Sequence, residues 1–252
     1  MIEKTNRILR FSHFGDPCSV LELATASFKE RTLKEVGKKN VIVRWLATPI
    51  NPADINLIQG KLFINPSGTY GVKPDNFPCV AGNEGVGEVL KSECDKLKEG
   101  DWVIPSSTQL GVWRDYSNIH SENLIKVDKR IGMLNAATIG VNPCTAYRLL
   151  QDYGALQPGD SVIFNAANSS VGKNLVKLAK KMGIKSICIL RDRSHYADVE
   201  NYLKKLGADL IIKEDELGKS AAKEKIIELG KPKVAFDAVG GTSSLDMTRA
   251  LR

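Results

Sequence analysis

The chain has 252 residues, of which 42% are hydrophobic and 26% charged, and its net charge is +7. These fractions are typical of a folded globular protein and exclude the disordered, collagen-like and fibrous classes. No apolar run reaches the roughly 18 residues that a membrane-spanning helix needs, so we expect no membrane span. The basic residues are scattered and no aromatic side chains interleave with them, so we expect no nucleic-acid binding.

The first half of the chain predicts short strands between turn signals. Apolar residues alternate over 41–47, which is typical of a half-buried strand. Further β structure is expected at 7–14, 20–24, 85–90, 101–104 and 113–127. Asn51 followed by Pro52 predicts a helix start, because asparagine caps free amides and proline suits the first helical position. Gly60 ends that helix, and a long loop over 61–79 follows, of a length that is often functional.

From about residue 132, strands and helices alternate. Asn142 and Pro143 predict the start of a second helix, which runs to about residue 153. The expected strands and helices that follow are 161–165, 171–182, 185–190, 196–206, 209–212, 218–229, 233–238 and 243–251. This alternation predicts a parallel, doubly wound α/β sheet. We therefore expect a β-rich domain over 1–131 and a dinucleotide-binding domain over 132–252.

The predicted second domain has four strands, whereas a dinucleotide-binding sheet usually has six. We therefore expect this chain to be a shortened version of a longer protein, with the C-terminal strands missing. The alternative is a naturally small sheet whose apolar edge strand, 233–238, is covered by the first domain.

The five cysteines are isolated and show no Cys-x-x-Cys spacing, which argues against a disulfide framework and against a zinc site. Together with three scattered histidines, this pattern predicts no bound metal. We interpret Glu84 as a buried, hydrogen-bonded structural carboxylate.

Small residues fill the predicted turn between strand 161–165 and the next helix. Such residues are needed where backbone amides at a helix N-terminus hold a pyrophosphate. Only one glycine is present, so the pattern departs from Gly-x-Gly-x-x-Gly, and an ordinary strand–helix turn is the alternative. The candidate cofactor-binding residues in this turn are Asn168, Ser169, Ser170, Val171 and Gly172.

Arg191 and Arg193 flank Asp192 at the end of the next strand, about 20 residues beyond the turn. An acidic residue at this place holds a ribose 2′-hydroxyl, whereas paired arginines suit a 2′-phosphate by charge and geometry. The pair therefore predicts NADPH as the cofactor. A solvated arginine pair, or NADH bound through Asp192, are the alternatives.

Several blocks of the sequence resemble the mitochondrial trans-2-enoyl-CoA reductase family, which belongs to the zinc-free branch of the medium-chain dehydrogenases/reductases. The resemblance covers about residues 7–252 and is carried by residues 51–56, 58–60, 82–85, 100–105, 111–114, 141–147 and 189–193. The Asn-Pro-Cys-Thr-Ala-Tyr and Arg-Asp-Arg blocks are specific to this family. The Gly-Asp-x-Val block is shared by the whole superfamily.

The resemblance implies a GroES-like β-rich domain followed by an incomplete Rossmann domain. It also implies NADPH-dependent reduction of trans-2-enoyl thioesters of coenzyme A or acyl carrier protein, in fatty acid synthesis. Hydride reaches the β-carbon, and Tyr70 is the implied donor of the proton that the α-carbon takes. The family usually places this tyrosine soon after the glycine that matches Gly60, whereas residues 61–68 intervene here. A surface tyrosine in the loop is the alternative.

The same resemblance assigns four further residues. Asn56, Asn142 and Thr145 are implied to contact the cofactor, and Trp113 is implied to line the substrate pocket. The alternatives are a capping or turn role for Asn56 and a core role for Trp113. Asn142 is expected to cap its helix in addition to facing the cofactor.

Location and assembly follow from the resemblance as well. A mitochondrial location is implied, although no transit peptide is visible in the sequence. The family forms homodimers, and we expect this chain to lack the interface strands. A quinone or enone reductase of the same superfamily is an alternative function. So is an inactive, truncated binding module that uses its open sheet edge.

Overall fold

The computed structural model describes residues 3–29, 39–61, 63–65, 68–70 and 77–251, with backbone alone for 63–65 and 68–70. These residues divide into a first unit, Met1–Gly140, and a second unit, Val141–Arg252. Each unit has hydrophobic clusters of its own.

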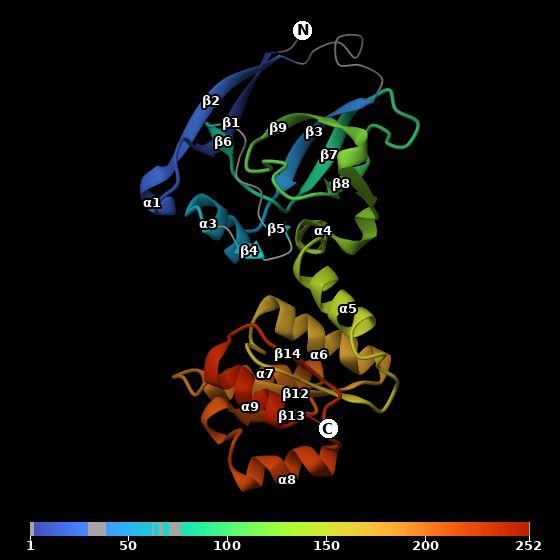
Figure 1. The fold of residues 1–252 in the computed structure, drawn as a ribbon. Coiled ribbons are helices and arrows are strands. Elements are labelled where there is room, and N and C mark those ends of the chain that lie inside the picture. The colour runs from blue at the N-terminus through green and yellow to red at the C-terminus, as the bar shows by residue number, and fades with distance from the viewer. Residues whose placement is uncertain (1–2, 30–38, 62, 66–67, 71–76, 252) are drawn as a thin grey trace. The chain divides into compact units, whose positions relative to one another are not determined.

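The first unit contains antiparallel β structure in the described ranges (Figure 1). One sheet has the strand order β2-β1-β6, a second has the order β10-β8-β7-β3-β9, and β4 pairs with β5. The strands are β1 (Glu3–Phe11), β2 (Leu21–Lys29), β3 (Asn40–Ala47), β4 (Phe63–Asn65), β5 (Gly68–Tyr70), β6 (Cys79–Val80), β7 (Val86–Ser92), β8 (Trp102–Pro105), β9 (Tyr116–His120) and β10 (Leu124–Val127). The helical segments are α1 (Pro17–Val20), α3 (Pro52–Ile58), η1 (Ser121–Asn123), η2 (Lys129–Ile131) and α4 (Met133–Thr138).

Strand β3 behaves as its alternating sequence predicts. Val41, Val43 and Trp45 are buried in one cluster, together with side chains from the neighbouring strands of the same sheet. The predicted helix at residue 52 is present as α3, and Gly60 follows its end with a left-handed φ of +68°. Each region of this half that was predicted to be β structure does contain a strand, although the bounds of the strands differ from the predicted ones.

Three details of the first unit differ from the sequence prediction. Strands β4 and β5 and the start of β6 fall within the predicted loop 61–79. The first strand ends at Phe11 rather than at residue 14, because Asp16 caps a short helix and its side chain accepts from Cys18 N at 3.0 Å. Helix α4 was not predicted. Its Ala136 and Ala137 pack with Val86 and Ile104, so the segment after the predicted 131/132 boundary packs in the first unit.

The second unit is built on a parallel four-stranded sheet with the order β13-β12-β11-β14 (Figure 1). Its strands are β11 (Ser161–Phe164), β12 (Lys185–Leu190), β13 (Leu210–Lys213) and β14 (Val234–Phe236). Its helical segments are α5 (Asn142–Asp152), α6 (Ser170–Met182), α7 (Tyr196–Leu206), η3 (Glu214–Glu216), α8 (Ser220–Leu229) and α9 (Gly241–Arg249). The predicted strands and helices of this half are all present.

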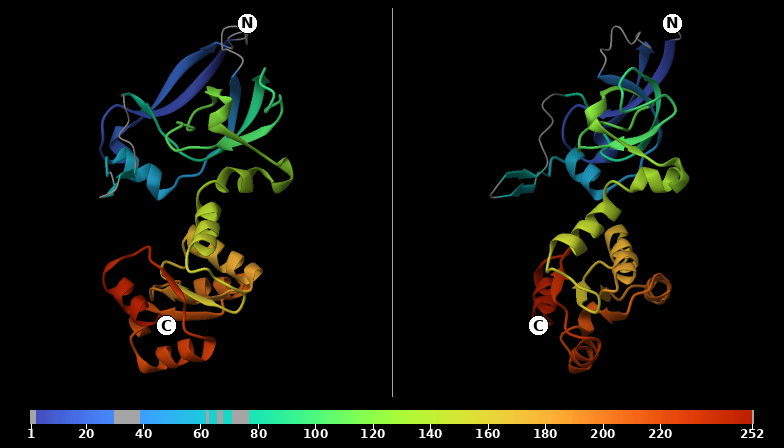
Figure 2. Two further views of the ribbon diagram at one scale, coloured as in Figure 1. Left: turned by 45° about the vertical axis from the view of Figure 1, so that its right-hand side comes forward. Right: turned by 90° about the vertical axis from the view of Figure 1, so that its right-hand side faces the viewer.

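Helices cover both faces of this sheet, as Figure 2 shows. Val162 and Phe164 of β11 point to the face that α5, α6 and α7 cover, whereas Ile163 between them points to α8 and α9. This alternation follows from the two-residue period of a strand. A parallel sheet buried on both faces confirms the predicted doubly wound α/β class.

The turn from β11 into α6 brings helix and turn backbone unusually close. A Cβ atom at Gly172 would lie 2.5 Å from the carbonyl oxygen of Ala167, a distance that real Cβ atoms do not reach. Ala166, in the same turn, has a left-handed φ of +48°. Gly172 therefore stands where helix and turn approach too closely for any side chain.

We expect Gly172→Ala to lower the free energy of unfolding by about 1–3 kcal/mol, since the added methyl meets backbone that must move. Gly218→Ala is the matched control, because a Cβ at Gly218 would meet no atom within 4 Å. Urea unfolding of both variants measures the difference. Equal midpoints for the two variants would contradict the close approach.

Candidate functional site

The carboxyl ends of β11, β12 and β14 surround a cavity of about 710 Å³ in the second unit. Three of the predicted cofactor-binding residues, Asn168, Arg191 and Arg193, line it. Ala166, one of the small residues of the predicted turn, also lines it. The sequence did not predict the other principal lining residues, which are Ser194, His195, Tyr196, Glu214 and Val239. The structure therefore brings the end of β12 and the turn after β11 to one concave site.

Ion pairs hold the first two residues of the Arg191–Arg193 segment. Arg191 Nε donates to Glu214 Oε2 at 3.1 Å. Asp192 Oδ2 accepts from Lys213 Nζ at 2.8 Å, and this hydrogen bond raises the pKa of Lys213. The Lys213 ammonium also lies 4.9 Å from the ring centroid of Tyr196. Two acidic and three basic side chains thus meet at this rim of the cavity.

Asn165, at the end of β11, ties the carboxyl edge of the sheet together. Asn165 is buried, with only 4% of its surface exposed. Its Nδ2 donates to Asp237 Oδ1 at 2.6 Å and to Ser243 Oγ at 3.2 Å, and its Oδ1 accepts from Ala238 N at 2.7 Å. These hydrogen bonds therefore hold the ends of β11 and β14 and the first turn of α9 together at this edge of the sheet.

The N-terminus of α6 is capped by a serine. Ser169 Oγ accepts from Gly172 N at 3.0 Å. The amides of Ser170 and Val171 stand at the first helical positions, where no intrahelical acceptor exists. Such amides, with the helix dipole behind them, favour an anion. Ser169, Val171 and Gly172 also line a smaller cavity of about 290 Å³ beside β14.

These features fit the adenosine and pyrophosphate portions of NADPH. The close approach at Gly172 keeps the turn backbone free of side chains, and the helix start offers amide donors. The guanidinium groups of Arg191 and Arg193 line the cavity at the strand end where a 2′-phosphate is held in this class of fold. The donor set therefore suits a phosphorylated dinucleotide.

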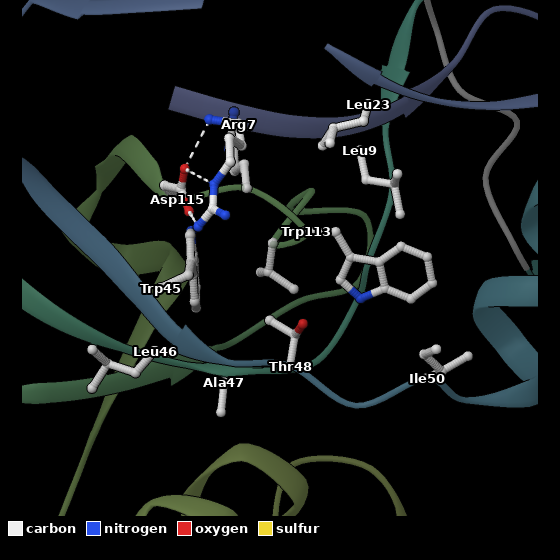
Figure 3. A pocket seen from close by; sticks show the side chains of 12 residues that line it. Arg7, Leu9, Leu23, Trp45, Leu46, Ala47, Thr48, Ile50, Trp113 and Asp115 are labelled. Carbon is white, nitrogen blue, oxygen red and sulfur yellow. Dashed lines mark hydrogen bonds and ion pairs between the residues drawn. The ribbon is translucent and has the colours of Figure 1, made fainter. Parts of the chain in front are cut away.

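Trp113 lines a separate, open cavity of about 420 Å³ in the first unit (Figure 3). The side chains of Leu9, Leu23 and Ile50 surround its indole ring in that view. Trp113 Nε1 donates to Pro49 O at 3.3 Å, and a Cβ on Gly82, whose φ is +93°, would collide with the ring. The ring is thus held in place by the chain around it, with an apolar cavity on one side.

An ion pair lies at the other end of this cavity. Arg7 Nε and Nη2 each donate to the Asp115 carboxylate at 3.0 Å (Figure 3). The Arg7 guanidinium holds the pKa of Asp115 below its ordinary value. The cavity is therefore apolar around Trp113 and charged at the Arg7 end.

The polar residues of the sequence motifs around 51–54 and 83–84 form a buried network. Asp54 accepts from Asn51 N at 2.8 Å and from Asn83 Nδ2 at 2.6 Å, and Asn51 Nδ2 donates to Glu84 Oε2 at 2.7 Å. Asp54 and Glu84 are 1% and 3% exposed. This confirms that Glu84 is a buried, hydrogen-bonded carboxylate. The network fixes the start of α3, which carries Asn56.

The other predicted site residues are placed as follows. Asn56 is half-buried in α3, and Thr145 is exposed on α5. Asn142 is the first residue of α5, and Val141 takes the cap position, so the expectation that Asn142 caps this helix is wrong. Residue 70 is described by its backbone, in β5 opposite residue 63, and the Tyr70 phenol lies outside the described residues.

Within the described ranges, no group of three or more His, Cys, Asp and Glu side chains is arranged to hold a metal ion. No helix in those same ranges has the length and apolar character needed to cross a membrane. The cysteines Cys18, Cys79, Cys94, Cys144 and Cys188 are all free thiols, and burial raises the pKa of Cys188 far above its ordinary value.

Comparison with known proteins agrees with this architecture. Residues 37–129 match the alcohol dehydrogenase GroES-like domain. Rat mitochondrial enoyl-acyl-carrier-protein reductase is 44% identical over 247 residues, which are 97% of this chain and 62% of that protein. The solved Etr1p/NADP/crotonyl-CoA complex superposes with a TM-score of 0.86 at 34% identity, covering 100% of this chain and 73% of that one. The Candida tropicalis mitochondrial 2-enoyl thioester reductase Etr1p/Etr2p heterodimer has a TM-score of 0.85 at 36% identity over the same shares.

The chain belongs to the mitochondrial enoyl-acyl-carrier-protein reductase family. It spans about 62% of the length of the rat family member. Family membership confirms the predicted fold class, a GroES-like β-rich domain followed by a Rossmann domain. It also confirms the resemblance inferred from the sequence blocks.

Among the lining and rim residues that the sequence did not predict are Lys213, Glu214 and Val239. Glu214 and Lys213 lie where β13 ends, and Val239 lies three residues after the end of β14. The signal that could have found them is the parallel sheet itself, because all its carboxyl ends meet at one edge. The predicted residues came from the ends of β11 and β12, whereas the ends of β13 and β14 carry no short motif of their own.

Asp237 follows β14 and accepts several hydrogen bonds at the same edge. Gly240 N donates to Oδ1 at 3.0 Å, Val239 N donates to Oδ1 at 3.1 Å, and Asn165 adds its amide. The bond from Gly240 is the main cause that lowers the pKa of Asp237. Because its pKa is lower in the folded state, its contribution to stability is present above the unfolded pKa and is lost as pH falls.

We expect Asp237→Asn to be less stable than the parent at pH 7. The difference should shrink below pH about 4, where the unfolded carboxyl takes up its proton and the folded carboxyl follows. Urea unfolding at pH 7, 5 and 3.5 measures this, with Asp215→Asn, an exposed position in η3, as the control. A difference that stays constant over this range would contradict the titration.

Proposed function

We propose that this family member catalyses the NADPH-dependent reduction of trans-2-enoyl thioesters to saturated acyl thioesters in mitochondrial fatty acid synthesis. The observation that carries the proposal is the pair of arginines at the end of β12, which line a cavity beside the small-residue turn of a Rossmann unit. Family membership supports it, as does the similar protein that was solved with NADP and crotonyl-CoA.

In this proposal the second unit binds the cofactor. Arg191 and Arg193 hold the 2′-phosphate through charge-assisted hydrogen bonds. The amides of Ser170 and Val171, with Asn168 and Ser169 beside them, hold the pyrophosphate at the start of α6, where Gly172 keeps the backbone accessible. We assign further cofactor contacts to Asn56, Asn142 and Thr145. Bound NADPH supplies the hydride for the β-carbon of the substrate.

The proton for the α-carbon comes from the phenol of Tyr70 in this proposal. Reduction of the double bond consumes one proton besides the hydride, and a weak acid next to the developing negative charge serves as its donor. Trp113, whose indole lines the apolar cavity of the first unit, contacts the substrate. The substrate's thioester carrier is coenzyme A or acyl carrier protein.

We expect Tyr70→Phe to lower the turnover of crotonyl-CoA by more than about tenfold, because the phenylalanine has no proton to give. NADPH binding, measured by fluorescence titration, should stay unchanged. Tyr202→Phe, at a half-exposed tyrosine of α7, is the control. Equal turnover for Tyr70→Phe and the parent would remove Tyr70 from the reaction. Turnover of an o-quinone without turnover of crotonyl-CoA would contradict the proposed substrate class.

We expect the double substitution Arg191→Ala with Arg193→Ala to weaken NADPH binding by at least about tenfold and to leave NADH binding nearly unchanged. The two dissociation constants are measured by nucleotide fluorescence. Arg148→Ala with Arg249→Ala removes the same charge from exposed positions on α5 and α9 and should change neither constant. An unchanged preference in the first variant would contradict the 2′-phosphate assignment.

A further inference from the structure

The segment Arg191-Asp192-Arg193 separates its charges between two sides. The arginines at both ends line the 710 Å³ cavity, whereas Asp192 between them does not. Asp192 instead accepts a hydrogen bond from Lys213 Nζ at 2.8 Å, and its side chain is 54% exposed. The acidic side chain is thus drawn out of the cavity wall by a lysine from the neighbouring strand.

The strand register fixes this contact. Lys213, the last residue of β13, is the ladder partner of Leu190 at the end of β12. Lys213 therefore stands beside a residue only two positions before Asp192, and its long side chain can reach the Asp192 carboxylate. The ring of Tyr196, which lines the cavity, lies 4.9 Å from the ammonium and bounds its other side. Lys213 is held between the aspartate and the cavity wall.

The charge of Asp192 matters for which dinucleotide the site accepts. An acidic side chain at this strand end accepts the ribose 2′-hydroxyl of an unphosphorylated cofactor and repels a 2′-phosphate. The neighbouring Glu214 is occupied by Arg191, at 3.1 Å. Lys213 is the cation that pairs with Asp192, and the carboxylate of Glu216 also acts on its ammonium. Loss of the Lys213 charge would therefore leave the Asp192 carboxylate without this partner and make the rim more negative.

We propose that Lys213 determines the preference for the 2′-phosphorylated cofactor, by pairing with Asp192 and holding its carboxylate away from the phosphate site. This inference rests on the proposed NADPH site and adds a specificity residue to it. Lys213 is a positioning residue, because it acts through Asp192 rather than through contact with the ligand.

A second way for Lys213 to act is by direct contact with the phosphate. The two ways differ when Asp192 is also changed. If Lys213 acts through Asp192, removal of both charges restores the preference, because no carboxylate is left to repel the phosphate. If Lys213 touches the phosphate itself, removal of Asp192 does not replace the lost contact.

The experiment titrates the full chain with adenosine 2′,5′-bisphosphate and with adenosine 5′-monophosphate by calorimetry. Neither probe requires turnover. The variants are Lys213→Gln, Lys213→Arg, Asp192→Asn and the double variant Lys213→Gln with Asp192→Asn. Lys223→Gln, at an exposed position of α8, is the matched control for loss of one lysine. Circular dichroism checks that each variant is folded.

We expect Lys213→Gln to weaken the bisphosphate by about fivefold and the monophosphate by less than about twofold, the scale of a solvent-exposed charge pair. Lys213→Arg and the double variant should bind the bisphosphate as the parent does. Unchanged binding in Lys213→Gln would overturn the inference and leave the proposed function standing. So would equal losses in the single and double variants. A parent that binds both probes equally would overturn the proposed NADPH site, and this inference with it.

Discussion

The parallel pairing of β11, β12, β13 and β14 is the constraint on which the second unit depends. Parallel strands must all end at the same edge of the sheet, so residues far apart in the chain meet there. Asn165 and Asp237, separated by 72 residues, share a hydrogen bond of 2.6 Å at that edge. Every group that we assign to the cofactor in this unit, other than Asn142 and Thr145, lies within a few residues of a strand end or at the start of α6.

Much of this arrangement could be predicted from the sequence because its signals are local. Alternating strands and helices, the small-residue turn and the Arg191–Arg193 pair are each readable within a short window. The pairing of Asp192 with Lys213 could not be predicted in this way, because 21 residues separate them and only the strand register brings them together. The helix start at Asn142 was predicted, but its cap was not, because Val141 gives no side-chain signal for that role.

In the first unit, a residue pattern misleads for a second reason, which is that polar residues can serve packing rather than chemistry. The polar residues Asn51, Asp54, Asn83 and Glu84 have the composition of a reactive site, yet they are buried and bonded to one another. Buried polar groups must be satisfied, and a closed network does so while holding adjacent loops rigid. Such a network positions Asn56 and the loop on which the Trp113 indole rests. Its own polar groups are occupied by the hydrogen bonds that they make to one another.

The contact between Lys213 and Asp192 is made by side chains that are 31% and 54% exposed. Exposed charges feel dissolved ions, whose screening distance is about 8 Å at physiological ionic strength and about 3 Å at 1 M. Amide donors at a helix start act at contact range and are screened far less. Added salt should therefore weaken the discrimination between phosphorylated and unphosphorylated dinucleotides before it weakens binding of the pyrophosphate that both share. The selectivity of the site would then depend on ionic strength as well as on the amino-acid sequence.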